Sequence, residues 1–119
     1  MQSRINDVNV WQLEEEGARL GSLQSALDLI GETYGKEIEL VAIPIARLER
    51  DFLRLGSGLA GAFIEKMQQY GLRVAIIGDI HERLGKSKPL RDFVIETNRR
   101  GQHLIVRDDA ELNAKLRRF

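Results

Sequence analysis

The sequence predicts an α/β domain with a largely parallel sheet, and two apolar runs carry most of that prediction. The runs are Val41 to Ile45 and Val74 to Ile77. Neither run alternates apolar with polar residues, which is typical of strands that are covered on both faces. A charged stretch and a glycine-rich helix start lie between them. Strand, helix and strand in that order predict a parallel unit.

Length and composition limit the classes of protein to which the chain can belong. It has 119 residues, no cysteine, and 18 basic against 18 acidic side chains. This length favours one domain, residues 1–119, and the missing cysteine excludes thiolate sites and fits a reducing compartment. The zero formal charge argues against nucleic-acid binding. With no apolar leader and no membrane-length run, we expect a cytoplasmic protein that does not enter a membrane.

The amino-terminal segment is expected to form a β-hairpin. Val8 and Val10 alternate along one strand, Glu14 to Gly17 suit a polar turn, and Ala18 to Leu20 are predicted to return as a short second strand. Trp11 then points to the face opposite the valines. There it either anchors an interface or covers the second face of the hairpin.

Capping residues mark helix one and the first central strand. Ser22 is a good N-cap, Gly35 suits the residue after a helix, and the apolar spacing between them predicts a helix over residues 23–34. A strand over residues 38–45 follows. Because Pro44 has no backbone N–H, we expect this strand to lose its pairing on one side near its end.

A charged connection over residues 46–55 leads to helix two. A short helical turn in it would place Phe52 and Leu55 beneath the carboxyl edge of the sheet. Helix two is expected over residues 58–70, with Ser57 as its N-cap. Its apolar stripe comprises Leu59, Ala60, Phe63, Ile64, Met67 and Tyr70.

The carboxy-terminal part is predicted to contain two further helices around a short strand. Ser87 caps helix three, which a loop over residues 80–86 precedes. The polar residues of that helix are expected at its surface, although the helical spacing of Asn98 from Val94 leaves open that Asn98 instead faces the core and bonds a loop carbonyl. The strand covers residues 103–106, and Asp108 then opens the last helix with a capping box.

Gly56-x-Gly58-x-x-Gly61 matches the fingerprint of dinucleotide-binding domains, and Asp79 follows 18 residues after its last glycine. That fingerprint needs a buried strand that runs straight into the first glycine. The charged segment Glu49 to Leu55 stands there instead. In a structural interpretation, small residues let the helix lie close on the sheet, and Gly56 supplies a turn conformation that other residues avoid. A nucleotide-binding protein or enzyme that uses this motif is therefore an alternative function.

The segment Leu55 to Gly61 resembles the helix start of the STAS family, the domain of anti-sigma-factor antagonists and sulfate transporters. The order of predicted elements is similar to that family from about Asp7 onward. The resemblance implies a STAS-like fold and a helix-capping serine that a partner kinase phosphorylates in the antagonists. Ser57 stands at that place. The family usually has an aspartate after the first central strand, where this chain has Pro44-Ile45-Ala46.

A closer resemblance spans nearly the whole chain. It is to an uncharacterised bacterial domain-of-unknown-function family, catalogued as four-one-eight-zero. The pattern that carries it comprises Asp51-Phe52, Gly58 to Gly61, Tyr70, Gly78-Asp79, Ser87, Arg91 to Phe93 and Glu96-x-Asn98. This resemblance implies a fold and a bacterial source, and no activity.

The sequence predicts a non-enzymatic binding or regulatory module that recognises a protein partner or a small anion. We expect the site at the start of helix two, where exposed N–H groups and the helix dipole favour negative charge. The expected residues are Ser57, Gly56, Gly58, Leu59 and Ala60, bordered by the loop residues Asp79, His81 and Ser87. A structural domain that pairs two copies of the chain is the other alternative.

Catalytic, cofactor and metal sites are not predicted. Asp79 and His81, even with His103 added, match no recognised spacing of metal ligands. Gly56-Ser57-Gly58 lacks the spacing of a nucleophile elbow.

Overall fold

The computed structural model describes residues 1–118 and shows a five-stranded mixed sheet. Its strands are β1 (Gln2–Ile5), β2 (Val8–Gln12), β3 (Leu40–Pro44), β4 (Arg73–Ile77) and β5 (Leu104–Val106). They lie side by side in chain order, with β1 antiparallel to β2 and the other neighbours parallel. The predicted α/β fold with a hairpin and a mostly parallel sheet is confirmed.

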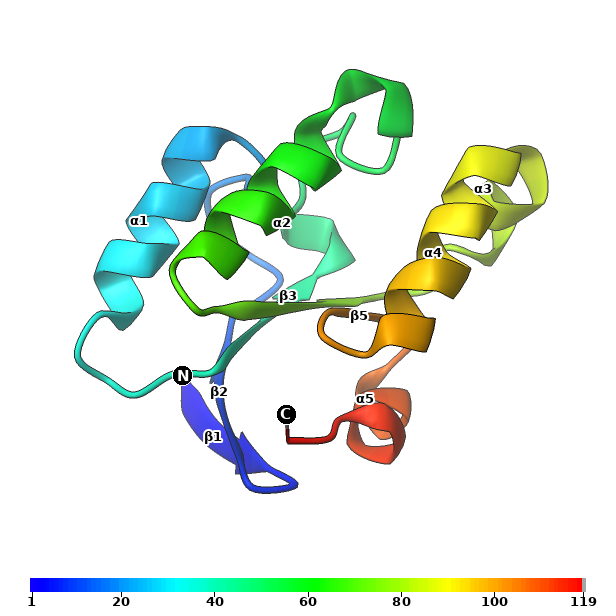
Figure 1. Cartoon of the computed structure of the whole chain (residues 1–119). Helices are drawn as coiled ribbons and strands as arrows, with labels where there is room; N and C mark the ends of the chain where they lie inside the picture. The colour runs from blue at the N-terminus through cyan, green and yellow to red at the C-terminus, as the bar shows by residue number, and fades with distance from the viewer. Residues whose placement is uncertain (119) are drawn as a thin grey trace.

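The helices divide unequally between the two faces of the sheet. They are α1 (Leu23–Thr33), α2 (Leu59–Gln69), α3 (His81–Lys86), α4 (Lys88–Arg100) and α5 (Asp109–Lys115), with 3₁₀ turns η1 (Ile45–Arg47) and η2 (Leu55–Ser57). Parallel crossovers are right-handed, and these crossovers all step in one direction, so their helices share a face. Figure 1 shows α1 to α4 on one side of the sheet and α5 on the other. Within residues 1–118, no helix has the length and apolar character needed to cross a membrane.

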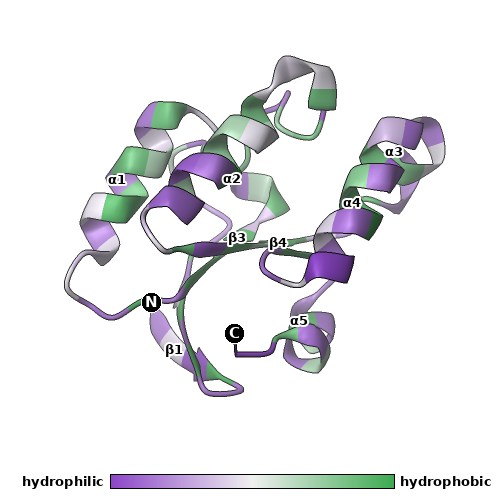
Figure 2. Ribbon diagram, in the orientation of Figure 1, coloured by the Kyte–Doolittle hydropathy of each residue, from purple (hydrophilic) through white to green (hydrophobic). Residues whose placement is uncertain are grey.

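Side chains that alternate along the strands supply two apolar layers. Under α1 to α4, the layer contains Val41 and Val74, together with Phe63 of α2. The opposite layer contains Val10 and is closed by Leu112 of α5. Figure 2 shows that β3 and β4 are hydrophobic, as expected for strands that contribute to both layers.

Local signals placed several boundaries correctly. The Ser22 hydroxyl accepts a hydrogen bond from the Ser25 N–H at 3.1 Å, and Gly35 has a φ of 78°, so the predicted cap and stop of α1 are confirmed. β2 pairs with β3 only as far as Ala42, whereas β4 pairs with β3 through Pro44. The one-sided loss of pairing near Pro44 is therefore also confirmed.

The hairpin lies one segment earlier than predicted. Asn6 and Asp7 join β1 to β2, and both have positive φ angles, 49° and 67°. Two such residues form the tight turn that matches the twist of paired strands. The predicted strand at Ala18 to Leu20 is wrong, because that segment carries the chain across to α1; only Leu20 makes an isolated parallel bridge, to Leu48.

Trp11 covers the helix-side face of the sheet. Its side chain is half-buried and packs against the layer under α1 and α2, and the Lys36 Nζ lies 5.9 Å from its ring centroid. Of the two roles expected for Trp11, the structure favours coverage of the hairpin over an exposed anchor.

Two apolar anchors differ from the prediction. Phe52 is fully buried and its ring meets Phe63 of α2 edge-on at 5.7 Å, so its predicted role as a buried anchor is confirmed. Its buried neighbour is Leu53, whereas Leu55 is only half-buried. Tyr70 does not belong to the buried stripe of α2: it follows the last turn and is 58% exposed.

The predicted loop at residues 80–86 is largely helical. Residues 81–86 form α3, and an ion pair of 3.7 Å joins Glu82 to Lys86 along one of its faces. The i,i+4 spacing of that pair is typical of a helix, but the glycines nearby favoured the prediction of a loop.

Asn98 closes the outer edge of β5. Its amide nitrogen donates to the Ile105 carbonyl at 2.9 Å, and its amide oxygen accepts from the Ile105 N–H at 2.7 Å. Of the two orientations left open for Asn98, the structure shows the inward one, and the partner is a strand and not a loop. The side chain thereby occupies the place of a neighbouring strand, which protects an otherwise unpaired edge.

Candidate functional site

α2 begins through a left-handed glycine. Gly58 is the N-cap, with a φ of 79°, and Ser57 precedes it in η2. The Ser57 hydroxyl accepts from the Leu59 N–H at 3.2 Å and donates to the Asp51 carbonyl at 2.9 Å. The predicted N-cap is therefore wrong by one residue, although the Ser57 oxygen still serves the first turn of the helix. Ala60, the second residue of α2, is buried in the apolar layer beneath the helix.

The glycines of the motif do not bring α2 close to the sheet. A Cβ added to Gly56, Gly58 or Gly61 would meet no other part of the described chain within 4 Å, so the predicted close-packed role is wrong. The positive φ belongs to Gly58 and not to Gly56. Within residues 1–118, neither packing nor a left-handed backbone requires glycine at Gly56 or Gly61.

The geometry around the motif differs from that of a dinucleotide-binding turn. Residues 45–57 form η1, a series of turns and η2, and no strand leads into Gly56. The charged connection expected here in place of a strand is therefore confirmed. Without a strand that ends at the first glycine, the motif cannot present pyrophosphate to the helix in the usual way.

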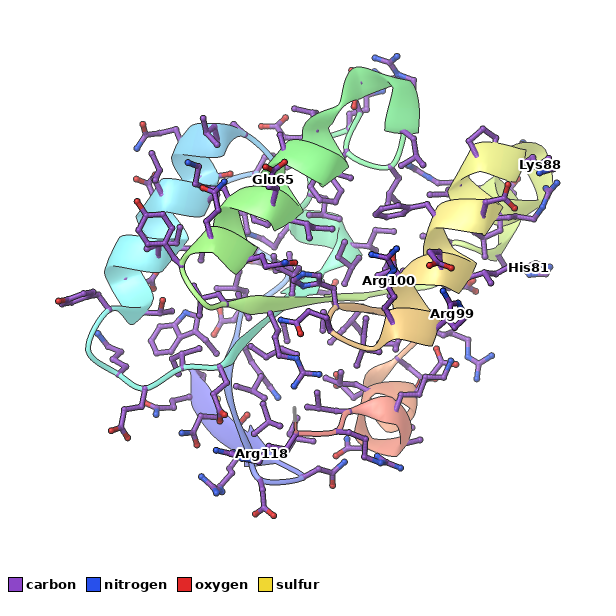
Figure 3. All side chains as sticks on the ribbon, in the orientation of Figure 1. Glu65, His81, Lys88, Arg99, Arg100 and Arg118 are labelled. Atoms are coloured by element: carbon purple, nitrogen blue, oxygen red, sulfur yellow. The ribbon has the colours of Figure 1, made fainter. Side chains whose placement is uncertain are left out.

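Asp79, His81 and Ser87 serve their own helices. The Asp79 carboxylate accepts from the His81 N–H at 2.9 Å, which supports the first turn of α3. The Ser87 hydroxyl caps α4 by accepting from the Leu90 N–H at 3.2 Å. The His81 side chain is exposed and points away from the sheet (Figure 3). No hydrogen bond within residues 1–118 joins these three residues to Ser57.

A pocket at the carboxyl ends of β4 and β5 contains residues that sequence reasoning missed. The chain leaves β4 toward α3 and leaves β5 toward α5, on the opposite face (Figure 1). Such a switch point is where open α/β sheets commonly bind ligands. The pocket has a volume of about 360 Å³, and Asp79 and His81 line it together with Arg107, Glu111 and Lys115. Arg107 follows β5 as Asp79 follows β4, a signal that required knowledge of the strand order.

Most charged groups of this pocket already have partners, inside or beside it. One Glu111 carboxylate oxygen accepts from the Arg107 backbone N–H at 2.7 Å, and the other lies 3.7 Å from the Lys115 Nζ. The Arg107 guanidinium lies 3.6 Å from the carboxylate of Asp108, which is outside the pocket lining. The pocket therefore offers charges of both signs.

His103 lies at the other end of the sheet, where it joins three elements. Its side chain is 8% exposed. Nδ1 accepts from the Val74 N–H at 3.0 Å, which assigns the ring proton to Nε2, 2.8 Å from the Gln68 side-chain oxygen. Burial, assisted by the charge of Arg73, lowers the pKa of His103. His103 is thus a neutral structural residue, and residues 1–118 contain no group of three side chains arranged to hold a metal ion.

Arg73 fixes the end of α4 and the carboxy-terminal segment. Its guanidinium donates to the carbonyl oxygens of Gln102 at 2.7 Å, Gly101 at 3.0 Å and Arg117 at 2.8 Å. Burial lowers the pKa of Arg73, while the charge of Glu39 acts in the opposite direction. The residue is 6% exposed, so we assign it a structural role.

The comparisons with known proteins identify a family and nothing narrower. The model of a family described as a domain of unknown function, DUF4180, matches residues 5–116. Neither a curated protein nor a solved structure matches the chain.

Proposed function

We propose that this chain, which belongs to the domain-of-unknown-function family DUF4180, acts as a binding and regulatory module. The module is non-enzymatic and STAS-like. Its site is the start of α2, and its partner is a protein that recognises this start. The STAS-like assignment is supported by a hairpin that precedes consecutive parallel strands, with the crossover helices on one face.

The single observation that carries the proposal is the pair of glycines that the fold does not require. Gly61 stands in the first turn of α2, and glycine destabilises a helix by up to about 1 kcal/mol relative to alanine. Gly56 stands two residues before the N-cap, and both positions open onto free space. Gly31 and Gly85 share this openness, but neither lies within five residues of another open glycine that the backbone does not require, as Gly56 and Gly61 do. A partner whose backbone must approach the start of α2 closely would account for two such glycines around Ser57.

Phosphate on Ser57 would change this surface through two contacts. Esterification removes the hydroxyl hydrogen that the Asp51 carbonyl accepts at 2.9 Å, and so releases the connection before α2. It also adds a charge of about −1.5 to −2 beside the first N–H groups of the helix, where the dipole stabilises negative charge. The same chain would then present two surfaces to a partner.

The experiment compares the partners captured by the wild-type protein, Ser57→Ala and Ser57→Asp. Ser22→Ala and Ser22→Asp are matched controls, because Ser22 accepts an equivalent bond at the start of α1. We expect the Ser57 variants to gain or lose a specific partner that the Ser22 variants retain. Identical partner sets for all five proteins would refute the switch. A Gly61→Ala variant that is more stable but loses the partner would support the role assigned to the open glycines.

Self-association is a second candidate, favoured by the contrast between the two edges of the sheet. Asn98 closes the edge at β5, whereas β1 forms the other edge with no further strand beside it in the described chain. A second copy could pair with β1 through its outward backbone groups. Sedimentation velocity at several concentrations tests this candidate, and a monomer at every concentration would exclude it.

A further inference from the structure

We propose that a second site, formed by three arginines at the carboxyl edge of the sheet, binds a small oxyanion that carries an apolar group. This site is distinct from the start of α2 and does not depend on Ser57. It is a pocket of about 390 Å³ whose lining includes Arg19, Arg50 and Arg83. The ligand class is an aryl or alkyl phosphate or carboxylate.

The three arginines come from three different elements. Arg19 lies between β2 and α1, Arg50 lies between β3 and α2, and Arg83 lies in α3 after β4. All three segments leave the carboxyl ends of neighbouring parallel strands and pass to the same face of the sheet (Figure 1). The fold therefore gathers cations that are 31 and 33 residues apart in the sequence into one pocket.

The positive charge in this pocket is only partly compensated. Neither Arg50 nor Arg83 makes a side-chain hydrogen bond or ion pair with any residue that the structure describes. Glu49 is the acidic member of the lining, so the lining carries two more positive than negative charges. Other exposed arginines, such as Arg99 and Arg54, do pair with carboxylates, which distinguishes the pocket from an ordinary charged surface.

Arg19 is already held in position. Its Nη1 donates to the carbonyl oxygens of Ala46 at 2.7 Å and Leu48 at 3.1 Å. These bonds leave the Nε and Nη2 donors of a planar, permanently charged group, and such groups bind phosphate and carboxylate oxygens in pairs. A guanidinium that is fixed before binding loses little side-chain entropy when the anion arrives.

The apolar part of the pocket lining favours an anion that carries an apolar group. This part is formed by Ile45, Leu48 and Leu53, of which Leu48 and Leu53 are 3% and 4% exposed. We refer to it as the floor of the pocket. Mostly apolar pockets with a few convergent polar groups are typical sites for small molecules. An inorganic anion would contact the guanidiniums alone, whereas an attached aryl or alkyl group would also cover this floor.

The test is a titration of the ¹⁵N-labelled full chain with phenyl phosphate, followed by amide chemical shifts. We expect saturable shifts concentrated on residues 45–53 and around Arg19 and Arg83. Arg50→Gln and Arg83→Gln should each weaken binding about tenfold, the loss expected for one charge-assisted contact. Glu49→Gln should tighten binding, because it removes the opposing charge. Arg54→Gln is the matched control: it lies on the same segment but outside the pocket lining, and it should change binding less than twofold.

Three results would overturn the proposal. The first is the absence of saturable shifts at phenyl phosphate concentrations that reach several millimolar. The second is equal weakening by Arg54→Gln and Arg50→Gln, which would indicate general charge attraction. The third is equal affinity for phenol, which would remove the anion from the site. Equal affinity for inorganic phosphate would overturn the apolar part of the assignment. Because Ser57 is unchanged in every variant, these outcomes are separate from those of the partner experiment.

Discussion

Replacement of Asn98 by alanine should destabilise the protein by about 2–3 kcal/mol. The change removes both bonds to Ile105, a residue that is only 5% exposed. A buried donor or acceptor that loses its partner costs about 1–3 kcal/mol. Water can reach the sheet edge once the side chain is gone, so we place each loss toward the lower end. For a chain of this length, the sum corresponds to a fall in Tm of about 10 °C.

Asn98→Asp separates the two bonds. The carboxylate can still accept from the Ile105 N–H, but its second oxygen faces the Ile105 carbonyl oxygen, and two acceptors repel one another. At neutral pH this variant should therefore be destabilised at least as much as Asn98→Ala. Urea unfolding followed by Trp11 fluorescence measures the free energies. Asn113→Ala is the control, since Asn113 is an exposed helical asparagine with one bond to the Asp109 carbonyl, and it should cost less than about 0.5 kcal/mol. If Asn98→Ala were no worse than this control, the idea that Asn98 replaces a missing strand would be wrong.

Three further predictions concern glycines and a histidine. A Cβ on Gly78 would lie 2.7 Å from the Ile45 Cβ, so Gly78→Ala should destabilise by about 1–3 kcal/mol in urea unfolding, and an unchanged midpoint would contradict the close approach. Gly61→Ala should stabilise by up to about 1 kcal/mol, whereas Gly58→Ala should destabilise by about 1–2 kcal/mol because of its left-handed backbone; calorimetry should therefore give Tm shifts of opposite sign. Because the folded-state pKa of His103 is lowered, its stabilising contribution is complete above a pH of about 6.5 and is lost as the pH falls below that value. Wild type should lose stability from pH 8 to 5 more steeply than His103→Gln, and parallel pH profiles would count against a neutral buried ring.

Signals that act within a few residues were sufficient for much of the fold. The apolar run that contains Val41 predicted a central strand, because a strand buried on both faces needs no polar alternation. Ser22 and Ser87 predicted helix starts, since their hydroxyls satisfy N–H groups only three residues away. Pro44 predicted the loss of pairing through the donor that it lacks. In each case the cause lies in the same stretch of chain as the effect.

Signals that compete locally were resolved only by the tertiary structure. Asn6-Asp7 and Glu14 to Gly17 both suit a turn next to the amino-terminal strand, and local signals do not show which of them forms the hairpin. The first forms the hairpin turn, because the second must carry the chain from β2 to α1 and so start a right-handed crossover. Gly61 misled in a similar way. Its spacing matches a nucleotide motif, but its position on α2 faces away from the sheet.

Site residues that depend on strand order could not be found from the sequence. Arg107 belongs beside Asp79 only if β5 lies next to β4, and this pairing became visible in the register of Ile77 with Val106. Arg19, Arg50 and Arg83 have no spacing that suggests a common site. They meet because their three strands are adjacent and parallel.

The strictly consecutive order of the strands explains why both proposed sites lie at the carboxyl edge of the sheet, on the face covered by α1 to α4. Each crossover steps to the next strand and returns over the same face, so the connections after β2, β3 and β4 must lie side by side. The backbone joins the first two directly: the Leu20 N–H donates to the Arg47 carbonyl and the Glu49 N–H donates to the Leu20 carbonyl, both at 2.7 Å. That pairing holds Arg19 and Arg50 on adjoining segments, and the remainder of the long second connection reaches Ser57 at the start of α2. A shorter connection, running directly from β3 into its helix, would lose the arginine pocket and the tether between Ser57 and Asp51 together. The length of this one connection is therefore the feature of the chain on which both binding surfaces depend.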